Sequence, residues 1–462
     1  MTAFNEYLVS RAKGHLIGVG GVSMSPLAEV LAGAGMEITG SDMAHSDKTA
    51  HLESLGVKVY FGHSADNIEP DTKFVVRTAA VHDDNPEIVR AHEMGIPVFE
   101  RAEAWGTIMT YYKNALCISG THGKTTTTSM CTHILMAAEK DPTVMIGGTL
   151  PILQAGHRIG NGDTIVMESC EYYDSFLNFF PTVAVILNIE ADHLDYFKEG
   201  LPAIERSFHK FAASVPEDGA IVANYEDKNT MDTIQGIDRK IITFGLDPMA
   251  DVYAENISFS GAKSMFDLYA FGEKVTDITL HVPGMHNIRN ALAAAASALQ
   301  LGIGPTAIKY GLAGFNGAGR RFEYKGKCNG AEVYDDYAHH PGELKATLDA
   351  VQSMDYKRTV VVFQPHTYTR TAALFNDFVE QLKRPDITYL AEIYAARETN
   401  TLGISSKDMA KEINGAKYFA TFDEIVQDLK KFAQPGDIIL TIGAGDVYKI
   451  GERLVEETHE TR

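Results

Sequence analysis

The stretch ISGTHGKTTTT, residues 118–128, places glycine, lysine and hydroxyl side chains where an apolar run gives way to a helical pattern. In a strand-to-helix turn, glycines let backbone N–H groups and the positive helix end converge on a phosphate, lysine adds charge, and a hydroxyl reaches Mg²⁺. Two residues separate the two glycines of this loop, whereas the Walker pattern has four. The sequence therefore predicts a shortened nucleoside triphosphate loop, with candidate ATP-binding residues Gly120, Thr121, His122, Gly123, Lys124 and Thr125.

Polar side chains also follow the next two apolar runs, in VMESCEYYDSF and LNIEADHLDYF. In an open parallel sheet the carboxyl ends of the strands share one edge, so these groups can reach the ligand of the phosphate loop. The cluster can complete a metal site, although any one acidic residue can equally be a helix cap. Mg²⁺ prefers oxygen ligands, whereas an imidazole suits transition metals, so we expect Mn²⁺ to substitute for Mg²⁺. The cluster comprises Glu168, Glu171, Asn188, Glu190, Asp192 and His193.

A second glycine loop, GVGGVSMS at 18–25, follows a short apolar run and precedes Asp42 in GSD. This spacing resembles a dinucleotide fingerprint, but Ser23 replaces the third glycine. Such a loop can bind NAD, bind another nucleotide diphosphate, or form a tight turn without a ligand. Arg101, in FERAE, can offer a planar fork to a diphosphate or remain a solvated surface charge.

Two further groups of polar residues lie later in the chain. His286, Asn287 and Asn290 begin an Ala-rich helical pattern, where they can contact a base or ribose or cap the helix. RRFE at 320–323 and DDYAHHP at 335–341 place paired arginines and paired aspartates close together in sequence. These charges can form a hinge surface or close over a nucleotide.

Short β-branched runs alternate with helical patterns along the whole chain, which predicts parallel βαβ units and an α/β fold. A length of 462 residues exceeds what one hydrophobic core supports. We expect three domains, at 1–112, 113–319 and 320–462. No short internal repeat interrupts this pattern.

The composition narrows the class of protein. Of the residues, 45% are hydrophobic and 22% are charged, and no apolar run reaches the roughly 18 residues of a membrane span. The start of the sequence lacks a signal-peptide pattern, so we expect a cytoplasmic protein with no membrane partner. A net charge of -20 argues against nucleic-acid binding. The cysteines form no C-x-x-C pair, and we expect buried thiols at Cys117, Cys131, Cys170 and Cys328.

Taken together, the motifs resemble the Mur ligase family, in order and across nearly the whole chain. The resemblance implies a Rossmann-like N-terminal domain for a UDP-sugar, a central P-loop ATPase-type domain with a mostly parallel sheet, and a Rossmann-like C-terminal domain that brings the amino acid. The motifs that support it are GVGGVSMS, GSD, ERAE, GTHGKTTTT, NIEADHLDYF, PGMHNIRNALAA, RRFE, DDYAHHP and QPHTYTRT.

The resemblance also implies a reaction: ATP-dependent ligation of L-alanine to the lactyl carboxylate of UDP-N-acetylmuramic acid, in peptidoglycan precursor synthesis. Phosphorylation gives the carboxylate a leaving group, and the amine then attacks the acyl phosphate. The expected cofactors are ATP and Mg²⁺, with Mn²⁺ as a substitute. The expected partners are the three small-molecule substrates, and the expected assembly is a monomer or weak homodimer.

Family roles fall on particular residues of this chain. The implied catalytic residues are Lys124, Glu168, Asn188 and His193, and the implied metal ligands are Thr125, Glu168 and His193. Further implied ATP contacts are Thr126, His286, Asn287, Asn290, Arg321 and Asp336. The implied UDP-sugar contacts are Gly18, Gly20, Gly21, Ser23, Asp42, His63 and Arg101. The implied amino-acid contacts are Tyr337, His339, His366 and Arg370.

The chain departs from the family pattern at three places. Many relatives read Glu-Ala-Asp-Glu-Ser-Asp where this chain has Glu-Ser-Cys-Glu-Tyr-Tyr at 168–173, which keeps both glutamates. Thr367 stands where an arginine is common, which leaves Arg370 more of the amino-acid carboxylate and puts strict alanine selectivity in doubt. Phe208 lies near the position of a carbamylated lysine in some members, and we expect nearby Lys210 to be a solvated charge.

The sequence leaves three rival functions open. A recycling ligase would join a tripeptide to the same sugar nucleotide. A nicotinamide-dependent oxidoreductase would use GVGGVSMS and Asp42 but leave GTHGKTTTT without a role. A nucleotide-gated switch would hydrolyse ATP without requiring an amine.

Overall fold

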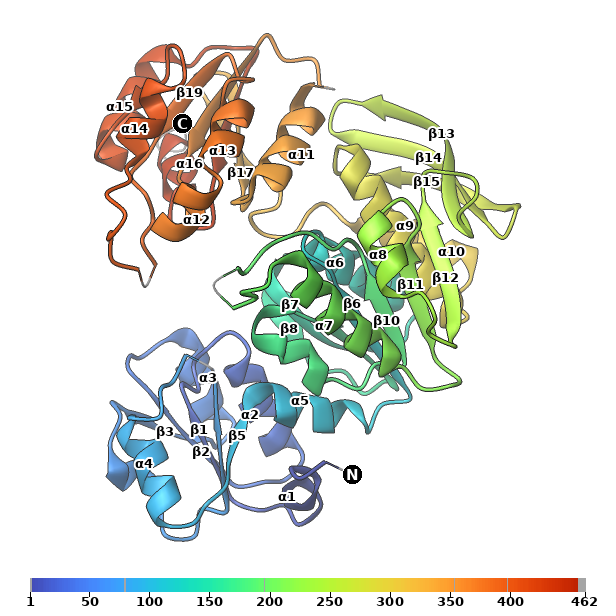
Figure 1. The fold of residues 1–462 in the computed structure, drawn as a ribbon, viewed down its shortest axis with the longest axis vertical. Helices are drawn as coiled ribbons and strands as arrows, with labels where there is room; N and C mark the ends of the chain where they lie inside the picture. Colours follow the sequence, from blue (N-terminus) through green and yellow to red (C-terminus); the bar gives the residue numbers. More distant parts are fainter. Residues whose placement is uncertain (1, 79, 195, 353, 397, 456–462) are drawn as a thin grey trace. The chain divides into compact units, whose positions relative to one another are not determined.

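The computed structural model describes residues 2–78, 80–194, 196–352, 354–396 and 398–455 (Figure 1). It contains three sheets with helices between their strands, which confirms the predicted α/β class. The chain divides into two compact units, Met1–Tyr253 with Ala270–Gly272 and Leu292–Gly311, and Ala254–Tyr269 with Glu273–Ala291 and Leu312–Arg462. The three-domain boundaries near 112 and 319 stay a prediction.

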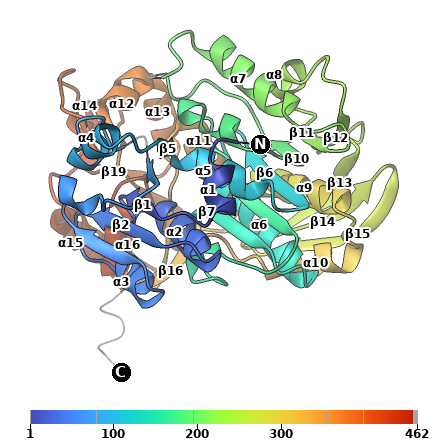
Figure 2. The same ribbon diagram turned by 90° about the horizontal axis from the view of Figure 1, so that it is seen from below.

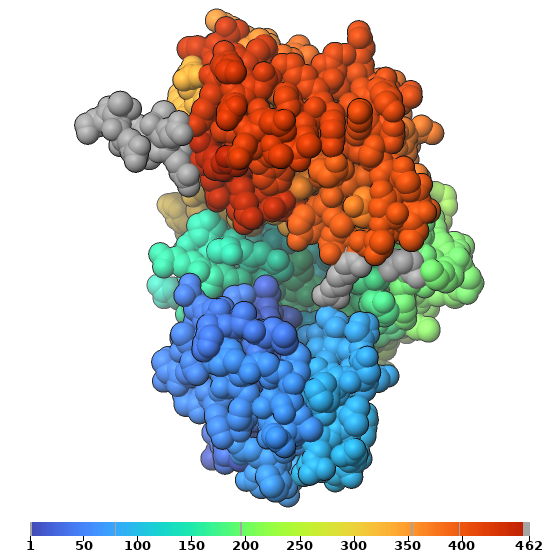
Figure 3. Space-filling view, turned by 90° about the vertical axis from the view of Figure 1, so that its left-hand side faces the viewer, coloured from blue at the N-terminus to red at the C-terminus, as the bar shows by residue number. Residues whose placement is uncertain are grey.

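The N-terminal sheet lies in the first unit and is parallel throughout, in the order β3-β2-β1-β4-β5. Its order reverses at β1, so the loop after β1 opens at the edge where doubly wound sheets bind ligands. Figure 3 shows the surface of this region in blue. The strands are β1 (Gly14–Ile17), β2 (Ile38–Asp42), β3 (Lys58–Phe61), β4 (Phe74–Arg77) and β5 (Val98–Glu100); the helices are α1 (Asn5–Val9), α2 (Met24–Gly33), α3 (Asp47–Ser54), η1 (Ala65–Asn67), α4 (Pro86–Glu93) and α5 (Arg101–Met109).

The central sheet of the first unit runs in the order β12-β11-β10-β6-β9-β7-β8. All neighbours are parallel except β7 and β8, and helix α6 packs beside β7 and β9 (Figure 2). The strands are β6 (Asn114–Ser119), β7 (Thr143–Leu150), β8 (Ala155–Arg158), β9 (Thr164–Glu168), β10 (Val183–Ile186), β11 (Ala220–Asn224) and β12 (Lys240–Gly245); the helices are α6 (Lys124–Ala137), η2 (Tyr172–Asn178), α7 (Leu201–Ala213) and α8 (Lys228–Thr233).

Strand β13 (Val252–Ser260) begins beside β12, where Val252 pairs with Phe244, and continues into the second unit. Strands β14 (Lys263–Ala270) and β15 (Glu273–Leu280) follow it in the sheet. Two helices come next, α9 (Met285–Gln300) and α10 (Pro305–Gly314).

The third sheet, in the second unit, has the order β16-β17-β21-β18-β19-β20 and is parallel except for the β16–β17 pair. Its central strands are apolar because both faces are covered. The strands are β16 (Glu323–Cys328), β17 (Ala331–Asp336), β18 (Arg358–Phe363), β19 (Ile387–Leu390), β20 (Lys417–Tyr418) and β21 (Asp437–Ile442); the helices are α11 (Pro341–Gln352), α12 (Tyr368–Ala373), α13 (Phe375–Leu382), α14 (Ser406–Lys411), α15 (Phe422–Phe432) and α16 (Tyr448–Val455).

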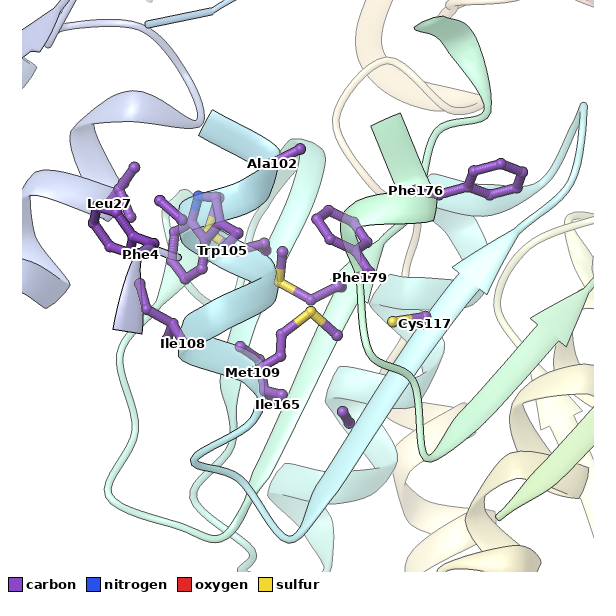
Figure 4. Packing of buried hydrophobic residues seen from close by; sticks show 14 of the residues in the cluster. Phe4, Leu27, Ala102, Trp105, Ile108, Met109, Cys117, Ile165, Phe176 and Phe179 are labelled. Atoms are coloured by element: carbon purple, nitrogen blue, oxygen red, sulfur yellow. The ribbon is translucent and has the colours of Figure 1, made fainter. Parts of the chain in front are cut away.

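Helix α5 contributes to a hydrophobic cluster that extends from the N-terminal sheet to the central sheet of the first unit. Its Trp105 is fully buried in a cluster that also contains Phe4 and Phe176 (Figure 4). A Cβ added at Gly106 would lie 1.8 Å from the carbonyl oxygen of Asn178, at the end of η2. Backbone therefore meets backbone between α5 and η2.

Among the described residues, none of the helices is both long and apolar enough for a membrane span.

Gly106→Ala tests this close contact. Because the methyl group has no room beside Asn178, we expect the variant to lower the free energy of unfolding by about 1–3 kcal/mol, measured by urea denaturation. Gly33→Ala is the matched control, since Gly33 lies at the exposed end of α2 with no atom within 4 Å of the added Cβ. Equal stability of the two variants would contradict the contact.

Candidate functional site

The phosphate loop connects the end of β6, at Ser119, to the start of α6, at Lys124. Gly120 and Gly123 have φ values of 135° and 85°, which favour glycine. A Cβ at Gly120 would also lie 2.9 Å from Cβ of Leu187. The glycines therefore allow the tight turn that the sequence predicts between a strand and a helix.

Lys124 is held at the mouth of this turn. Its Nζ donates to the carbonyl oxygen of Thr121 at 3.1 Å and to that of Gly120, and it pairs with Oε2 of Glu171 at 3.1 Å. Burial opposes its charge, but the nearby carboxylates, Glu171 foremost, outweigh burial and raise the pKa of Lys124 above its ordinary value. Lys124 is therefore a fixed, protonated cation at neutral pH.

Thr125 and Glu168 lie together beside it. The Thr125 hydroxyl donates to Oε1 of Glu168 at 3.0 Å, and the N–H of Gly147 donates to Oε2 at 2.6 Å. A hydroxyl and a carboxylate are the oxygen donors that Mg²⁺ prefers, so the residues present fit such an ion. The His193 ring is part of the same neighbourhood, with Nε2 3.9 Å from Oε1 of Glu171.

Asn188 supports the loop. Its Oδ1 accepts from the backbone N–H of His122 at 2.8 Å, and its Nδ2 donates to the His122 carbonyl at 3.1 Å. The hydroxyl of Thr121 accepts from the N–H of Glu190 at 2.8 Å. Of the strand-end residues predicted to approach the loop, Glu168, Glu171, Asn188 and Glu190 contact it, and Asn188 binds the loop backbone.

The loop after β1 has a carboxylate partner. Asp42, at the end of β2, accepts from the N–H of Gly20 at 2.8 Å and from that of Met43 at 2.8 Å. A Cβ at Gly20 would lie 2.9 Å from Oδ2 of Asp42. In this structure both carboxylate oxygens of Asp42 bind backbone N–H groups. The sequence pattern alone does not distinguish this role from contact with a ribose.

A buried polar cluster around Glu87 lies beside this loop, and only one of its members, His63, has a role predicted from the sequence. Glu87 is fully buried and accepts from the Ser41 hydroxyl at 2.7 Å and the Asn67 amide at 2.5 Å, and it lies 3.3 Å from Nδ1 of His63. Burial acts to raise the pKa of Glu87, but hydrogen bonds, that of His15 first, hold it below its ordinary value. The signal was the N-P-E start of α4, which reads as ordinary capping.

Arg101 is the first residue of α5. Burial lowers the pKa of its guanidinium, and the neighbouring Cys170 and Glu100 oppose that shift. Arg101 is therefore a half-buried charge beside the segment that follows β9.

In the second unit, the residues at the start of α9 form a local network. Asn287 donates to the Pro283 carbonyl at 2.7 Å, and Asn290 lies 3.4 Å from Oδ1 of Asn287. Burial, with a smaller effect of Arg289, lowers the pKa of His286 to about 4. The ring of His286 is therefore neutral at pH 7.

The paired arginines and aspartates separate into two roles. Arg320 donates to fully buried Asp335 at 2.9 Å and to the carbonyl of Gly445 at 2.8 Å, so it braces the fold. Arg321 lies over the ring of Tyr337, 5.1 Å from its centroid. Asp336 accepts from two backbone N–H groups, those of Phe322 and Ala338, each at 2.8 Å.

The predicted amino-acid residues come together at the ends of β17 and β18. The rings of His339 and His366 are 5.8 Å apart, and Nδ1 of His366 lies 3.5 Å from Arg370. Burial, followed by His339 and Arg370, lowers the pKa of His366 to about 4. Sequence reasoning missed Tyr394, whose ring stacks on His366 with centroids 5.6 Å apart; its signal was an aromatic residue just after the apolar run of β19.

The cysteines and Phe208 were also the subject of sequence-based expectations. Cys117, Cys131 and Cys328 are buried free thiols as predicted, whereas Cys170 is only half-buried. Phe208 is fully buried against Phe176, so a hydrophobic side chain fills this position.

Comparison with protein-family models gives three matches along the chain. Residues 13–113 match the Mur ligase family, catalytic domain; residues 118–298 match the Mur ligase middle domain; and residues 320–445 match the Mur ligase, glutamate ligase domain. UDP-N-acetylmuramate–L-alanine ligase of Clostridium novyi (strain NT) is 47% identical over 458 residues, 98% of this chain and 99% of that protein. The chain belongs to the Mur ligase family.

Two solved Mur ligase structures resemble this one. UDP-N-acetylmuramate-alanine ligase MurC from Thermotoga maritima has a TM-score of 0.80 at 30% identity, covering 97% of this chain and 100% of that chain. A murein peptide ligase from Psychrobacter arcticus has a TM-score of 0.68 at 24% identity, covering 96% and 98%, which shows a shared fold. As a Mur ligase, the chain is an ATP-dependent amide-forming enzyme, and the oxidoreductase alternative is less supported.

Asp336→Asn tests the electrostatics of the second unit. Burial, opposed by Arg321, raises the pKa of Asp336 from 3.8 to about 6. A raised folded-state pKa stabilises the fold fully below the unfolded value, and that stabilisation is lost as the pH rises through the folded value. We expect the unfolding free energy of the parent, minus that of the variant, to fall by about 2 kcal/mol between about pH 4 and pH 7.

Urea denaturation of parent and variant across this pH range measures the difference. The asparagine removes one carboxylate acceptor from the two N–H groups, which lowers stability equally at every pH. The test is therefore the pH dependence of the stability difference between parent and variant. A difference that does not change with pH would contradict the raised pKa of Asp336.

Proposed function

We propose that this Mur ligase joins L-alanine to the lactyl carboxylate of UDP-N-acetylmuramic acid, consuming ATP, in the cytoplasm. The observation that carries the proposal is the placement of Lys124 and Thr125 at the start of α6 beside Glu168 and Glu171. That arrangement suits transfer of a terminal phosphoryl group to a carboxylate. We assign the sugar nucleotide to residues 1–112, ATP to 113–319 and the amino acid to 320–462, in a monomer or weak homodimer.

The phosphate loop provides the binding groups for ATP. Its turn presents backbone N–H groups at the positive end of α6, and Lys124 adds a fixed positive charge. Glu171 balances that charge at 3.1 Å before a phosphate arrives. The loop is therefore preorganised, because neither a large backbone change nor a protonation change is needed when the nucleotide binds.

Thr125, Glu168 and His193 are the residues that would hold a divalent cation. The Thr125 hydroxyl and the Glu168 carboxylate already point at each other, 3.0 Å apart. A bound Mg²⁺, or Mn²⁺ in its place, supplies charge neutralisation to phosphoryl oxygens. Glu168 keeps its position through the backbone N–H of Gly147.

The remaining substrates have separate binding groups. Arg101, the loop at 18–23 and His63 suit an anionic sugar nucleotide, and Arg370 suits the carboxylate of an amino acid. Because the pKa of His366 is lowered to about 4, its ring is uncharged at neutral pH and can accept a hydrogen bond from an amine. The nitrogen then attacks the acyl carbon of the acyl phosphate, so that a C–N bond forms, the C–O bond to the phosphate breaks, and inorganic phosphate leaves.

The test is a product assay with ATP, Mg²⁺ and UDP-N-acetylmuramic acid. It is run with L-alanine, with a tripeptide of the kind that a recycling ligase would use, or with no amine. We expect an amide product, detected by mass spectrometry, and ADP in proportion to it with L-alanine. Amide formation with the tripeptide alone would establish the recycling reaction instead. ATP hydrolysis that no amine accelerates would establish the nucleotide-gated switch.

Lys124→Ala separates ATP chemistry from sugar binding. We expect a loss of amide formation by at least about 100-fold, because the phosphoryl group loses its fixed cation, while calorimetry gives an unchanged affinity for UDP-N-acetylmuramic acid. Lys140→Ala is the matched control, since Lys140 is exposed just beyond the other end of α6. Equal losses of sugar binding and turnover in Lys124→Ala would refute this division.

A further inference from the structure

His193 lies on a loop of the first unit, between β10 and α7, and adopts a left-handed conformation with φ 52°. Its Nε2 is 3.9 Å from both Glu171 and Asp192, which is beyond hydrogen-bond distance for either carboxylate. Neither of these carboxylates therefore fixes the ring by a direct hydrogen bond.

The ring of Tyr172 lies against the ring of His193. The two centroids are 4.3 Å apart and the planes differ by 21°, so the rings are stacked. Stacking fixes the plane of an imidazole through its face, and both ring nitrogens, which lie on the edge, stay available to a ligand. A hydrogen bond to one nitrogen would orient the ring but occupy that nitrogen.

The backbone that presents Tyr172 is strained. Tyr173 and Asp174, the next two residues of η2, have φ/ψ values of 54°/30° and 52°/25°. Left-handed conformations at non-glycine residues cost about 1–2 kcal/mol each and persist only where surrounding contacts enforce them. Consecutive strained residues beside a proposed ligand therefore indicate a positional requirement.

Several of the contacts made by Tyr173 and Asp174 involve the loop of His193 or the helix after it. The Asp174 carboxylate accepts from the Tyr196 hydroxyl at 2.8 Å and from the Ser207 hydroxyl on α7. The ring of Tyr173 lies 4.9 Å from the ring of Tyr196. Burial, together with Asp174, raises the pKa of Tyr196 to about 12, so its hydroxyl remains a donor at neutral pH.

We infer that Tyr172, Tyr173 and Asp174, here called the η2 clasp, are positioning residues that orient the His193 imidazole toward a divalent cation shared with Thr125 and Glu168. This inference rests on the proposed function. It gives a role to the two tyrosines that stand where many relatives have serine and aspartate.

The surroundings of the clasp allow it to be tested without unfolding the chain. Asp174 and Tyr196 line an open hollow of about 360 Å³ with Phe197, Arg206 and Ser207. Tyr172 does not line this hollow, but it is half-buried, so truncating its side chain leaves no closed cavity in the core. Thermal midpoints of all variants are measured to verify that they fold.

The experiment titrates the full chain, in the presence of ADP, with Mn²⁺ and follows free Mn²⁺ by electron paramagnetic resonance. We expect Tyr172→Ala to raise the Mn²⁺ dissociation constant by about 10-fold, as loss of residues that orient metal ligands commonly does. Tyr172→Phe retains the ring and should stay within about twofold of the parent, because stacking depends on the ring face. Tyr310→Ala, at a tyrosine of the first unit that is 66% exposed, controls for loss of a phenol.

A double-mutant cycle with His193→Ala identifies the route of the effect. If Tyr172 acts through His193, Tyr172→Ala produces no further loss of Mn²⁺ affinity in the His193→Ala background. Equal losses in both backgrounds, or unchanged Mn²⁺ binding in Tyr172→Ala, would overturn the inference. Unchanged binding in His193→Ala would overturn it as well, by removing His193 from the cation site.

The titration does not depend on amide formation, so the two proposals fail separately. Absence of an amide product from the parent chain counts against the proposed reaction, whatever the Mn²⁺ titration gives. In steady-state assays the clasp predicts a higher Mn²⁺ requirement for Tyr172→Ala with an unchanged KM for UDP-N-acetylmuramic acid, whereas general destabilisation would change both.

Discussion

The buried charge of Lys124 determines how the phosphate loop is built. An ammonium group with only 13% of its side chain exposed needs a counter-charge, and Glu171 supplies it from the segment after β9. This pair holds the turn between β6 and α6 against the end of β9, where Glu168 meets Thr125. The sheet edge therefore brings together the ammonium group, the two carboxylates and the threonine hydroxyl. The loop needs its glycines because the backbone turns tightly there.

Much of this arrangement could be predicted from the sequence, because it follows from local patterns. Alternating apolar and helical segments gave parallel βαβ units, and in such sheets the strand ends converge regardless of side-chain detail. The combination of Gly120, Gly123 and Lys124 specifies its own turn. Asn188 was correctly placed near the loop, although its exact partners, the backbone atoms of His122, depend on the pairing of β6 with β10.

Other features depend on tertiary structure and could not be predicted. Both arginines of RRFE lie over Tyr337, and nothing in the motif indicates that Arg320 pairs with buried Asp335 while Arg321 lies 3.9 Å from Glu343. Left-handed backbone at Tyr173 and Asp174 contradicts local preference, and contacts with Tyr196 and Ser207, which lie later in the chain, help to stabilise it. Glu87 appeared to be a helix-start residue, because its partners Ser41 and Asn67 lie far from it in sequence.

The absence of space between Gly106 and Asn178 has a mechanical consequence. Helix α5 begins at Arg101 and η2 begins at Tyr172, so the backbone contact joins a guanidinium suited to the sugar nucleotide with the ring beside His193. Close-packed backbones transmit displacement instead of absorbing it. Any coupling between the two ends of this strut must be reciprocal: if binding at Arg101 changes the affinity at His193, binding at His193 changes the affinity at Arg101 by the same factor.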